Sequence, residues 1–264
     1  MTEKVVFITG ASSGIGRAAA ITFARAGYDV CGFARRADRL AELAEEIDAL
    51  PHAHGEFIAE VGDVRERAQV AAAVTQTLER FGRLDVLVAN AGLGHHGTVA
   101  EGEWHHLEAV LRTNIDGVLH SIRASVPAMR ASGGGQILIV SSIVAGIHTP
   151  YTAVYAASKA FASSLAGSLR LELEDDDIGV TDVLVGRTAT EFNQNRLGTK
   201  DSASGRLPTV KAEEVGAALV KAAERRPRRV INRLFDRLVL AGGVIAPAIM
   251  ARLALRQYKP AGRD

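Results

Sequence analysis

Apolar and polar residues follow two different patterns along the chain. Short unbroken apolar runs, such as Val5–Ile8, alternate with longer segments in which apolar residues recur at helical spacing. Unbroken runs are typical of strands buried on both faces, and helical spacing is typical of amphipathic helices. The pattern predicts strands at 5–8, 29–34, 55–61, 84–89, 136–141 and 179–185, and helices at 17–26, 37–47, 65–81, 103–130 (one long helix or a broken one) and 154–174.

This strict alternation of strands and helices predicts an α/β fold. Right-handed crossovers between parallel neighbours then give a doubly wound parallel sheet with helices on both faces, a Rossmann-type arrangement. No low-complexity linker interrupts residues 1–232, so we expect a single domain. Within it, residues 186–208 are polar and rich in Thr, Asn, Ser and Gly, as expected of a lid.

Residues 233–264 form an apolar C-terminal extension. Leu238–Ala251 contains no charged residue. A spanning helix needs about 20 apolar residues, and Gly242, Gly243 and Pro247 interrupt this segment, so it does not predict a membrane span. We expect the extension to pack on the same domain or at a subunit interface, with a peripheral membrane contact as the alternative.

Composition and charge exclude several classes of protein. The 264 residues are 47% hydrophobic, which excludes a mainly disordered chain, and 31 basic against 30 acidic residues argue against a nucleic-acid partner. The single cysteine, Cys31, excludes an internal disulfide and a thiolate metal cage. Residues 1–10 contain no signal-peptide core, and we therefore expect a cytoplasmic protein.

A glycine-rich turn separates the first predicted strand from the first helix. Gly10, Gly14 and Gly16 remove the side chains that would keep an anion away from the helix N-terminus, where free N–H groups and the helix dipole attract negative charge. The spacing Gly-x3-Gly-x-Gly differs from the common G-x-G-x-x-G fingerprint. Its place between strand and helix nevertheless predicts a dinucleotide site.

The end of the second predicted strand indicates which dinucleotide is bound. A carboxylate there would hydrogen-bond the ribose 2′-hydroxyl of NAD and repel the 2′-phosphate of NADP. The sequence instead has Arg35 and Arg36, whose guanidinium groups grip phosphates well. We therefore predict NADP(H) as the cofactor. The alternative is that both arginines are a solvated pair at a helix start.

Three residues form a candidate catalytic group. Tyr155 and Lys159 are four residues apart, on one face of a predicted helix, and an ammonium near a phenol lowers its pKa. Ser142 follows the fifth predicted strand, at the sheet edge where open α/β sheets bind ligands. A tyrosine acid/base, a lysine that tunes it and a serine that anchors substrate are expected from this set.

Taken together, these motifs resemble the short-chain dehydrogenase/reductase family, in its compact single-domain branch. The resemblance covers residues 4–230 and rests on five motifs in order: Thr9–Gly10-x3-Gly14–Ile15–Gly16, Asn90–Ala91–Gly92, Asn114, Ser142 and Tyr155-x3-Lys159. It implies an NADP(H)-dependent oxidoreductase that moves hydride between nicotinamide and a carbonyl or secondary alcohol. A non-catalytic dinucleotide sensor or scaffold on the same fold is the alternative.

The resemblance also implies roles for single residues. Ser142 would hold the substrate carbonyl, Tyr155 would be the acid/base, Lys159 would bind the nicotinamide ribose, and Asn114 would anchor a water behind Lys159. The cofactor would be bound by the glycine turn with Ser12 and Ile15 at the pyrophosphate, Asp63 and Val64 at the adenine, Asn90 near the central sheet, and Thr188 or Thr190 at the carboxamide. One departure is Val185, which replaces the family's usual proline. Homodimers or homotetramers through helices at 102–132 and 154–174 are likewise implied.

Residues around the expected mouth of the site mix apolar and polar side chains, which favours a medium or large apolar substrate. This candidate wall comprises His95, His96, Val144, Ile147, His148, Tyr151, Phe192 and Leu197. Neighbouring histidines without cysteine do not form a metal-ligand pattern, so we expect no metal. The acidic run at 172–177 and the basic run at 225–229 are expected to be solvated surface.

Overall fold

The computed structural model describes residues 3–51, 54–199 and 209–259, and its core is one parallel sheet. Seven strands are hydrogen-bonded in the order β11-β7-β6-β4-β1-β2-β3, and every pairing among them is parallel. This arrangement confirms the predicted doubly wound α/β sheet in a single domain. The strands are β1 (Val5–Thr9), β2 (Asp29–Ala34), β3 (Phe57–Val61), β4 (Val86–Ala89), β6 (Gly135–Ser142), β7 (Ile178–Val185) and β11 (Arg229–Ile231).

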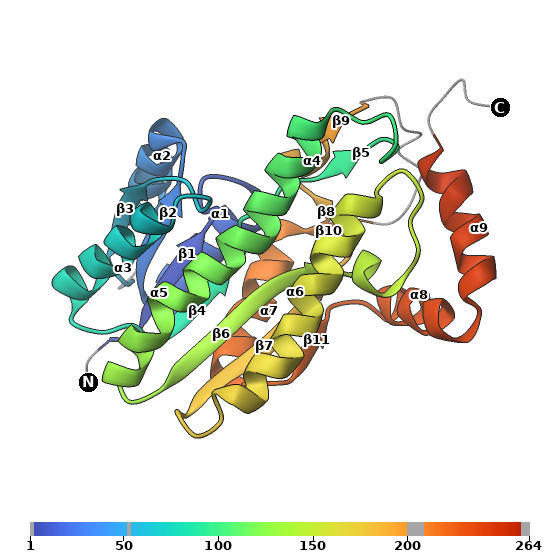
Figure 1. The fold of residues 1–264 in the computed structure, drawn as a ribbon. Helices are drawn as coiled ribbons and strands as arrows, with labels where there is room; N and C mark the ends of the chain where they lie inside the picture. Colours follow the sequence, from blue (N-terminus) through green and yellow to red (C-terminus); the bar gives the residue numbers. More distant parts are fainter. Residues whose placement is uncertain (1–2, 52–53, 200–208, 260–264) are drawn as a thin grey trace.

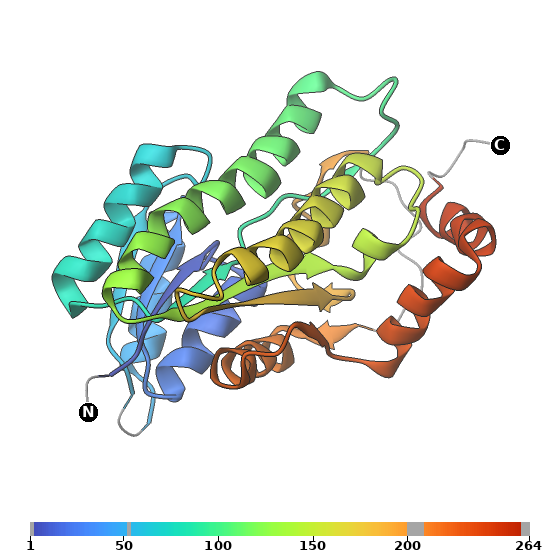
Figure 2. The same ribbon diagram turned by 60° about the horizontal axis from the view of Figure 1, so that its bottom comes forward.

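Helices cover both faces of the sheet (Figures 1 and 2). Successive strand residues point to opposite faces, so Val6 and Ile8 of β1 belong to one hydrophobic core and Val5 and Phe7 to the other. The first core is closed by α1 (Gly14–Arg25), α2 (Ala37–Asp48) and α7 (Ala212–Arg225), and the second by α3 (Arg67–Phe81), α5 (Gly117–Ala131) and α6 (Ala153–Glu172).

The segment predicted as a long or broken helix at 103–130 is broken. It comprises α4 (Trp104–Leu111), a π-helical turn η1 (Arg112–Asp116) and α5. The side chain of Asn114, inside the π turn, bonds the backbone of Leu93 in both directions, with Oδ1 accepting from N at 2.7 Å and Nδ2 donating to O at 3.0 Å. A π turn is an irregularity that is frequent at functional sites.

Short strands organise the described part of the predicted lid. β8 (Thr188–Ala189) pairs with β10 (Val210–Lys211), and β9 (Leu197–Gly198) pairs with β5 (His95–His96). Between them lies η3 (Glu191–Asn193), while η2 (Ile143–Gly146) follows β6. Residues 200–208 of the predicted lid lie outside the described residues.

The order of the strands creates a crevice beside β1. Because β1 pairs with both β2 and β4, the chain reverses its direction of winding there, and ligands of such sheets bind at the carboxyl ends of the strands at this point. The glycine turn follows β1 and Asn90 follows β4, so the topology brings both to the crevice.

The C-terminal extension folds as two helices, α8 (Leu234–Ile245) and α9 (Pro247–Tyr258), which project at the end of the molecule opposite α2 and α3 (Figures 1 and 2). α8 approaches η2 closely, since a Cβ atom on Gly243 would lie 2.4 Å from the carbonyl oxygen of Gly146. No helix in the described ranges is long and apolar enough to cross a membrane.

Candidate functional site

The glycine turn after β1 leaves no room for side chains. Gly10 and Gly14 have φ angles of +71° and +55°, in the region that favours glycine. Gly16 lies inside α1, where an added Cβ would lie 2.2 Å from the carbonyl oxygen of Gly10. The Gly10 N–H donates to the carbonyl of Phe33 at 2.8 Å, which fixes the turn against β2. The result is a backbone cradle at the N-terminus of α1 that fits a pyrophosphate.

Asn90 joins the two strands that border the crevice. Its Nδ2 donates to the Thr9 carbonyl at 2.9 Å, and its backbone N–H donates to Thr9 Oγ1 at 3.1 Å. These bonds tie the end of β4 to the end of β1. Asn90 therefore lies at the central sheet, beside the glycine turn.

Arg36 reaches the same turn from the end of β2. Its Nε and one terminal nitrogen both donate to Ser12 Oγ at 3.2 Å, and its other terminal nitrogen lies 3.6 Å from a carboxylate oxygen of Glu191. Arg35 is more exposed and lies 3.8 Å from Asp63. The Arg36 guanidinium thus places positive charge beside the glycine turn, while Arg35 lies near Asp63.

Asp63 and Val64 follow β3 and have different surroundings. Asp63 accepts two hydrogen bonds from the Arg65 guanidinium, at 2.9 and 2.6 Å. Burial raises the pKa of Asp63, but these bonds, the bond from the Arg65 backbone and the charges of Arg65 and Arg35 together lower it. Val64 is buried against Gly117 of α5, and its carbonyl lies 2.9 Å from His120 Nδ1. Asp63 therefore lies near Arg35, whereas Val64 is packed on α5.

Ser142 and Tyr155 meet at the carboxyl end of β6. The Tyr155 hydroxyl hydrogen-bonds Ser142, whose Oγ also donates to the Val185 carbonyl at 3.2 Å and accepts from the Val144 N–H at 3.4 Å. The ring of Phe192 lies 5.6 Å from the Tyr155 ring, measured between centroids. A hydroxyl pair of this kind can bind one carbonyl oxygen from two sides.

Lys159 and Asn114 lie behind Tyr155. The Lys159 ammonium is buried and donates to the Val140 carbonyl at 2.8 Å. Asn114 Nδ2 donates to Ser158 Oγ at 2.9 Å. A Cβ atom on Gly92 would lie 3.3 Å from Asn114 Oδ1 and 3.4 Å from Lys159 Nζ, so both polar ends converge on the same glycine.

The pKa of Tyr155 shifts in the direction opposite to the expected one. We expected a nearby ammonium to lower the pKa of this phenol, but burial raises it to about 12, and the Ser142 hydrogen bond only partly offsets the rise. Burial also lowers the pKa of Lys159 to about 8. Desolvation therefore dominates both groups in the protein without ligands.

The lowered pKa of Lys159 makes stability depend on pH. Between pH 8 and the ordinary value of 10.5, the unfolded chain holds the lysine proton and the folded chain does not, so the free energy of unfolding rises with pH. We expect wild type to gain about 1.5 kcal/mol relative to Lys159→Met between pH 8 and 9.5. Urea unfolding of both proteins measures this difference, and a constant difference would contradict the shift.

Thr190, in the segment predicted to be a lid, packs against the glycine turn. The Thr190 methyl group lies 3.2 Å from the position of an added Cβ on Gly14, and Thr190 Oγ1 accepts from the Phe192 N–H at 3.3 Å. Thr188 is buried and donates to the Gly186 carbonyl at 3.2 Å. The buried carboxylate of Asp236, in α8, packs against Gly186, so the tail supports the segment where Val185 replaces a proline.

The candidate wall residues differ in their exposure. His95 and His96 are buried in β5, and in the described residues their Nδ1 atoms lack hydrogen-bond partners. Burial lowers the pKa of both imidazoles, so they are neutral near pH 7. Val144 is buried and His148 is exposed, whereas the other wall residues are half-buried: Ile147, Tyr151, Phe192 and Leu197.

Tyr258 is a site residue that the sequence reading missed. Its carbonyl oxygen lies 2.7 Å from His96 Nε2, and its phenol is close enough to Tyr155 to raise the pKa of that residue. Arg187 and Arg196 also act on the Tyr258 phenol and lower its pKa, although burial outweighs them. Only the apolar character of the tail hinted at this contact. The end of α9 thus helps to enclose Tyr155.

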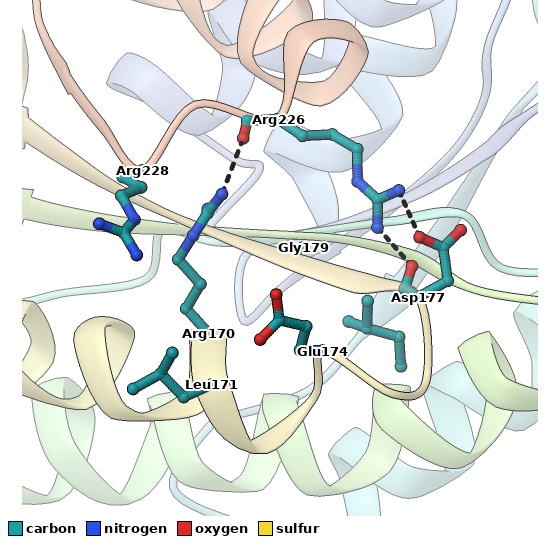
Figure 3. Close-up of a pocket in the computed structure, with 8 residues that line it drawn as sticks. Arg170, Leu171, Glu174, Asp177, Gly179, Arg226 and Arg228 are labelled. Atoms are coloured by element: carbon teal, nitrogen blue, oxygen red, sulfur yellow. Dashed lines mark hydrogen bonds and ion pairs between the residues drawn. The ribbon is translucent and has the colours of Figure 1, made fainter.

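A second hollow lies at the opposite edge of the sheet, where β7 begins (Figure 3). Two of its basic groups have partners: Arg170 donates to the carbonyls of Val180 and Arg226, and Arg226 pairs with Asp177 at 2.8 Å. The acidic run at 172–177 and the basic run at 225–229, both predicted to lie on the surface, meet at this hollow. Among the described residues, no group of three or more His, Cys, Asp or Glu side chains could hold a metal ion.

Comparisons with known proteins support this geometry. The family model described as short chain dehydrogenase matches residues 4–201. Sulfoacetaldehyde reductase 2 from Chromohalobacter salexigens is 36% identical over 242 residues, covering 88% of this chain and 93% of its own. Dehydrogenase/reductase SDR family member 7B from Bos taurus is 34% identical over 263 residues, covering 95% and 80%.

A solved structure agrees with both. The alcohol dehydrogenase from the archaeon Thermococcus sibiricus, complexed with 5-hydroxy-NADP, superposes with a TM-score of 0.72 at 30% identity and covers 86% of this chain and 93% of its own. The fold, the order of the motifs and the convergence of Ser142, Tyr155 and Lys159 agree with these matches. The chain belongs to the short-chain dehydrogenase family of oxidoreductases.

Proposed function

We propose that this protein is an NADP(H)-dependent oxidoreductase that interconverts a carbonyl compound and its alcohol. One observation carries the proposal: the Tyr155 hydroxyl meets Ser142 at the carboxyl end of β6, with the buried ammonium of Lys159 one helical turn away. A non-catalytic sensor would need only the cradle and not this hydroxyl pair. Relatives with reductase activity in their names support carbonyl chemistry.

The glycine turn at the N-terminus of α1 is the candidate cradle for the pyrophosphate of a nicotinamide dinucleotide, and side chains at Gly10 and Gly16 would collide with the backbone and with Asn90 that shape this turn. Thr188 and Thr190 are the candidates for the carboxamide, and Asp63 and Val64 for the adenine. The bound cofactor supplies or accepts a hydride. Lys159 would contact the nicotinamide ribose, and Asn114 would hold a water behind it, as the resemblance implies.

In the reducing direction, the protein's own groups act on the carbonyl oxygen. Ser142 Oγ and the Tyr155 hydroxyl bind this oxygen, and the Tyr155 proton moves to it as negative charge develops. With its pKa raised to about 12, the phenol is fully protonated at neutral pH, as a proton donor must be. In the oxidising direction, the phenol must lose its proton, which favours alkaline conditions.

The walls favour a medium or large apolar carbonyl compound. Val144, Phe192 and Tyr151 supply apolar surface, and the neutral imidazoles of His95 and His96 add little charge. A panel of aldehydes and ketones of increasing length, followed by NADPH consumption, tests the proposed function. No turnover of any carbonyl or alcohol, despite NADPH binding, would favour the sensor instead.

The choice of NADP(H) rests on Arg36 and Arg35. We expect kcat/KM to be higher with NADPH than with NADH, and Arg36→Ala to reduce that preference roughly 10- to 100-fold, since a hydrogen bond to a charged group contributes about 1.5–3 kcal/mol. Arg39→Ala, on the exposed side of α2, is the matched control and should leave the preference unchanged. A wild-type preference for NADH would contradict the assignment.

The expected assembly is a homodimer or homotetramer through α4, α5 and α6. The resemblance supports this assembly, and analytical ultracentrifugation measures it. A cytoplasmic location is part of the same proposal.

A further inference from the structure

The surface of α8 and α9 is the most apolar exposed surface of the described chain. Twelve large hydrophobic side chains are exposed in residues 3–51, 54–199 and 209–259, and eight of them lie between Leu234 and Leu255. Val244 and Ile245 are 81% and 83% exposed. A concentration of exposed apolar side chains on two successive helices is typical of a site of interaction. We call this surface the tail face.

Basic side chains lie among these apolar ones. Arg237, Arg252 and Arg256 are exposed, and Arg252 and Arg256 lie on the same side of α9 as Ile249 and Leu253. The buried Asp236 pairs with Arg233 at 2.8 Å. No carboxylate within the described ranges forms an ion pair with Arg237, Arg252 or Arg256. The tail face is therefore both apolar and cationic.

The charge of the whole chain is divided unequally. Residues 225–264 contain ten basic and two acidic residues, a formal charge of +8, although the whole chain carries only +1. The first 224 residues therefore carry −7. A net charge near zero conceals an acidic body and a strongly basic end.

We propose that the tail face docks on the surface of an anionic lipid bilayer. Apolar side chains interleaved with arginines are the signature of helices that lie in a membrane interface, where basic residues are attracted by anionic headgroups. α8 and α9 have 12 residues each, about 18 Å, too short for a bilayer core of about 30 Å, so they would lie along the interface. A symmetric dimer through this face is disfavoured, since it would bring the same positive charges together.

The placement of the tail face adds a consequence for access to the site. α8 packs on η2 directly after Ser142, and the Tyr258 carbonyl at the end of α9 contacts His96. A bilayer under the tail face would therefore lie beside the proposed mouth. This consequence depends on the proposed function, but the docking itself does not.

Co-sedimentation of the full chain with vesicles tests the proposal. We expect binding to vesicles of phosphatidylcholine with phosphatidylglycerol, at least tenfold weaker binding to phosphatidylcholine alone, and weakening by salt. Arg237→Glu/Arg252→Glu/Arg256→Glu should lose binding to the anionic vesicles at least tenfold. Leu238→Glu/Leu253→Glu should lose it as well. Circular dichroism checks that each variant is folded.

Matched controls change the same residue types elsewhere. Val61→Glu removes an apolar side chain that is 57% exposed on β3, and Arg67→Glu/Arg123→Glu/Lys221→Glu reverses three exposed charges on other helices. Both should bind as wild type does. The proposal would be overturned if the protein bound both vesicle types equally, or if the control variants lost binding as much as the tail-face variants. It would also be overturned if the protein did not bind vesicles but self-associated in a way that Leu238→Glu/Leu253→Glu abolishes, because a second copy of the chain would then be the occupant.

Discussion

Replacing Tyr155 with phenylalanine should lower turnover by about 10²-fold or more while leaving NADPH affinity close to that of wild type. The change removes one hydroxyl group, which is the proposed proton donor and the partner of Ser142. The ring and its contact with Phe192 remain, so the shape of the site is kept. Steady-state kinetics with the best carbonyl substrate and titration of NADPH fluorescence measure the two quantities.

The matched control is Tyr28→Phe, which removes the hydroxyl of another buried tyrosine. Tyr28 packs edge-on against Phe23, in the core on the α1 side of the sheet. Its loss should leave turnover unchanged. Equal turnover of wild type and Tyr155→Phe would contradict the assigned role, and equal losses in both variants would indicate a general effect on stability.

Gly16→Ala should weaken dinucleotide binding at least 10²-fold and lower the melting temperature. The added Cβ would lie 2.2 Å from the Gly10 carbonyl oxygen and 2.6 Å from Asn90 Nδ2. The Gly10 backbone and the Asn90 side-chain amide cannot both move away from this Cβ without displacing the glycine turn and breaking the hydrogen bond that joins β4 to β1. Because the cradle depends on that turn, the loss should appear in affinity for NADPH as well as for NADH, measured by isothermal calorimetry.

Gly167→Ala is the matched control for this change. Gly167 also lies inside a helix, but nothing lies within 4 Å of an added Cβ. Alanine is favoured over glycine in helices by about 1 kcal/mol, so this variant should be at least as stable as wild type. Tight NADPH binding by Gly16→Ala would show that the cradle is not the dinucleotide site.

Most strands of the central sheet could be predicted because each has an apolar pattern in its own residues. The unbroken apolar run Val5–Ile8 is buried on both faces and can be recognised from its own residues, whereas the strands at the two edges of the sheet, β3 and β11, are only partly buried. The two-residue strands β5 and β9 could not be predicted, because His95 pairs with Leu197, which is about 100 residues away in the chain, and neither segment has a strand pattern of its own. The π turn around Asn114 likewise arises from contacts with Leu93 that no local pattern encodes.

The candidate site shows the same division. Ser142, Tyr155 and Lys159 follow from strand ends and helical spacing, and the structure brings them together. The place of Tyr258 in the site could not be predicted in this way. Tyr258 is more than 100 residues from Tyr155 in the chain, and it comes near the site only because the C-terminal extension packs there. The pKa of Tyr155 was expected to fall, because spacing reports neighbours but not burial, and burial dominates.

Cys31 gives the protein a practical property. It is the only cysteine in the chain, it lies in β2 with no solvent exposure, and burial raises the pKa of its thiol to about 12. Since the thiolate is the form that reacts with maleimides, Cys31 does not react with such reagents while the protein is folded. In a Leu253→Cys variant, the introduced cysteine would therefore be the one that reacts, and a fluorophore could be attached at this single position without first removing the native cysteine.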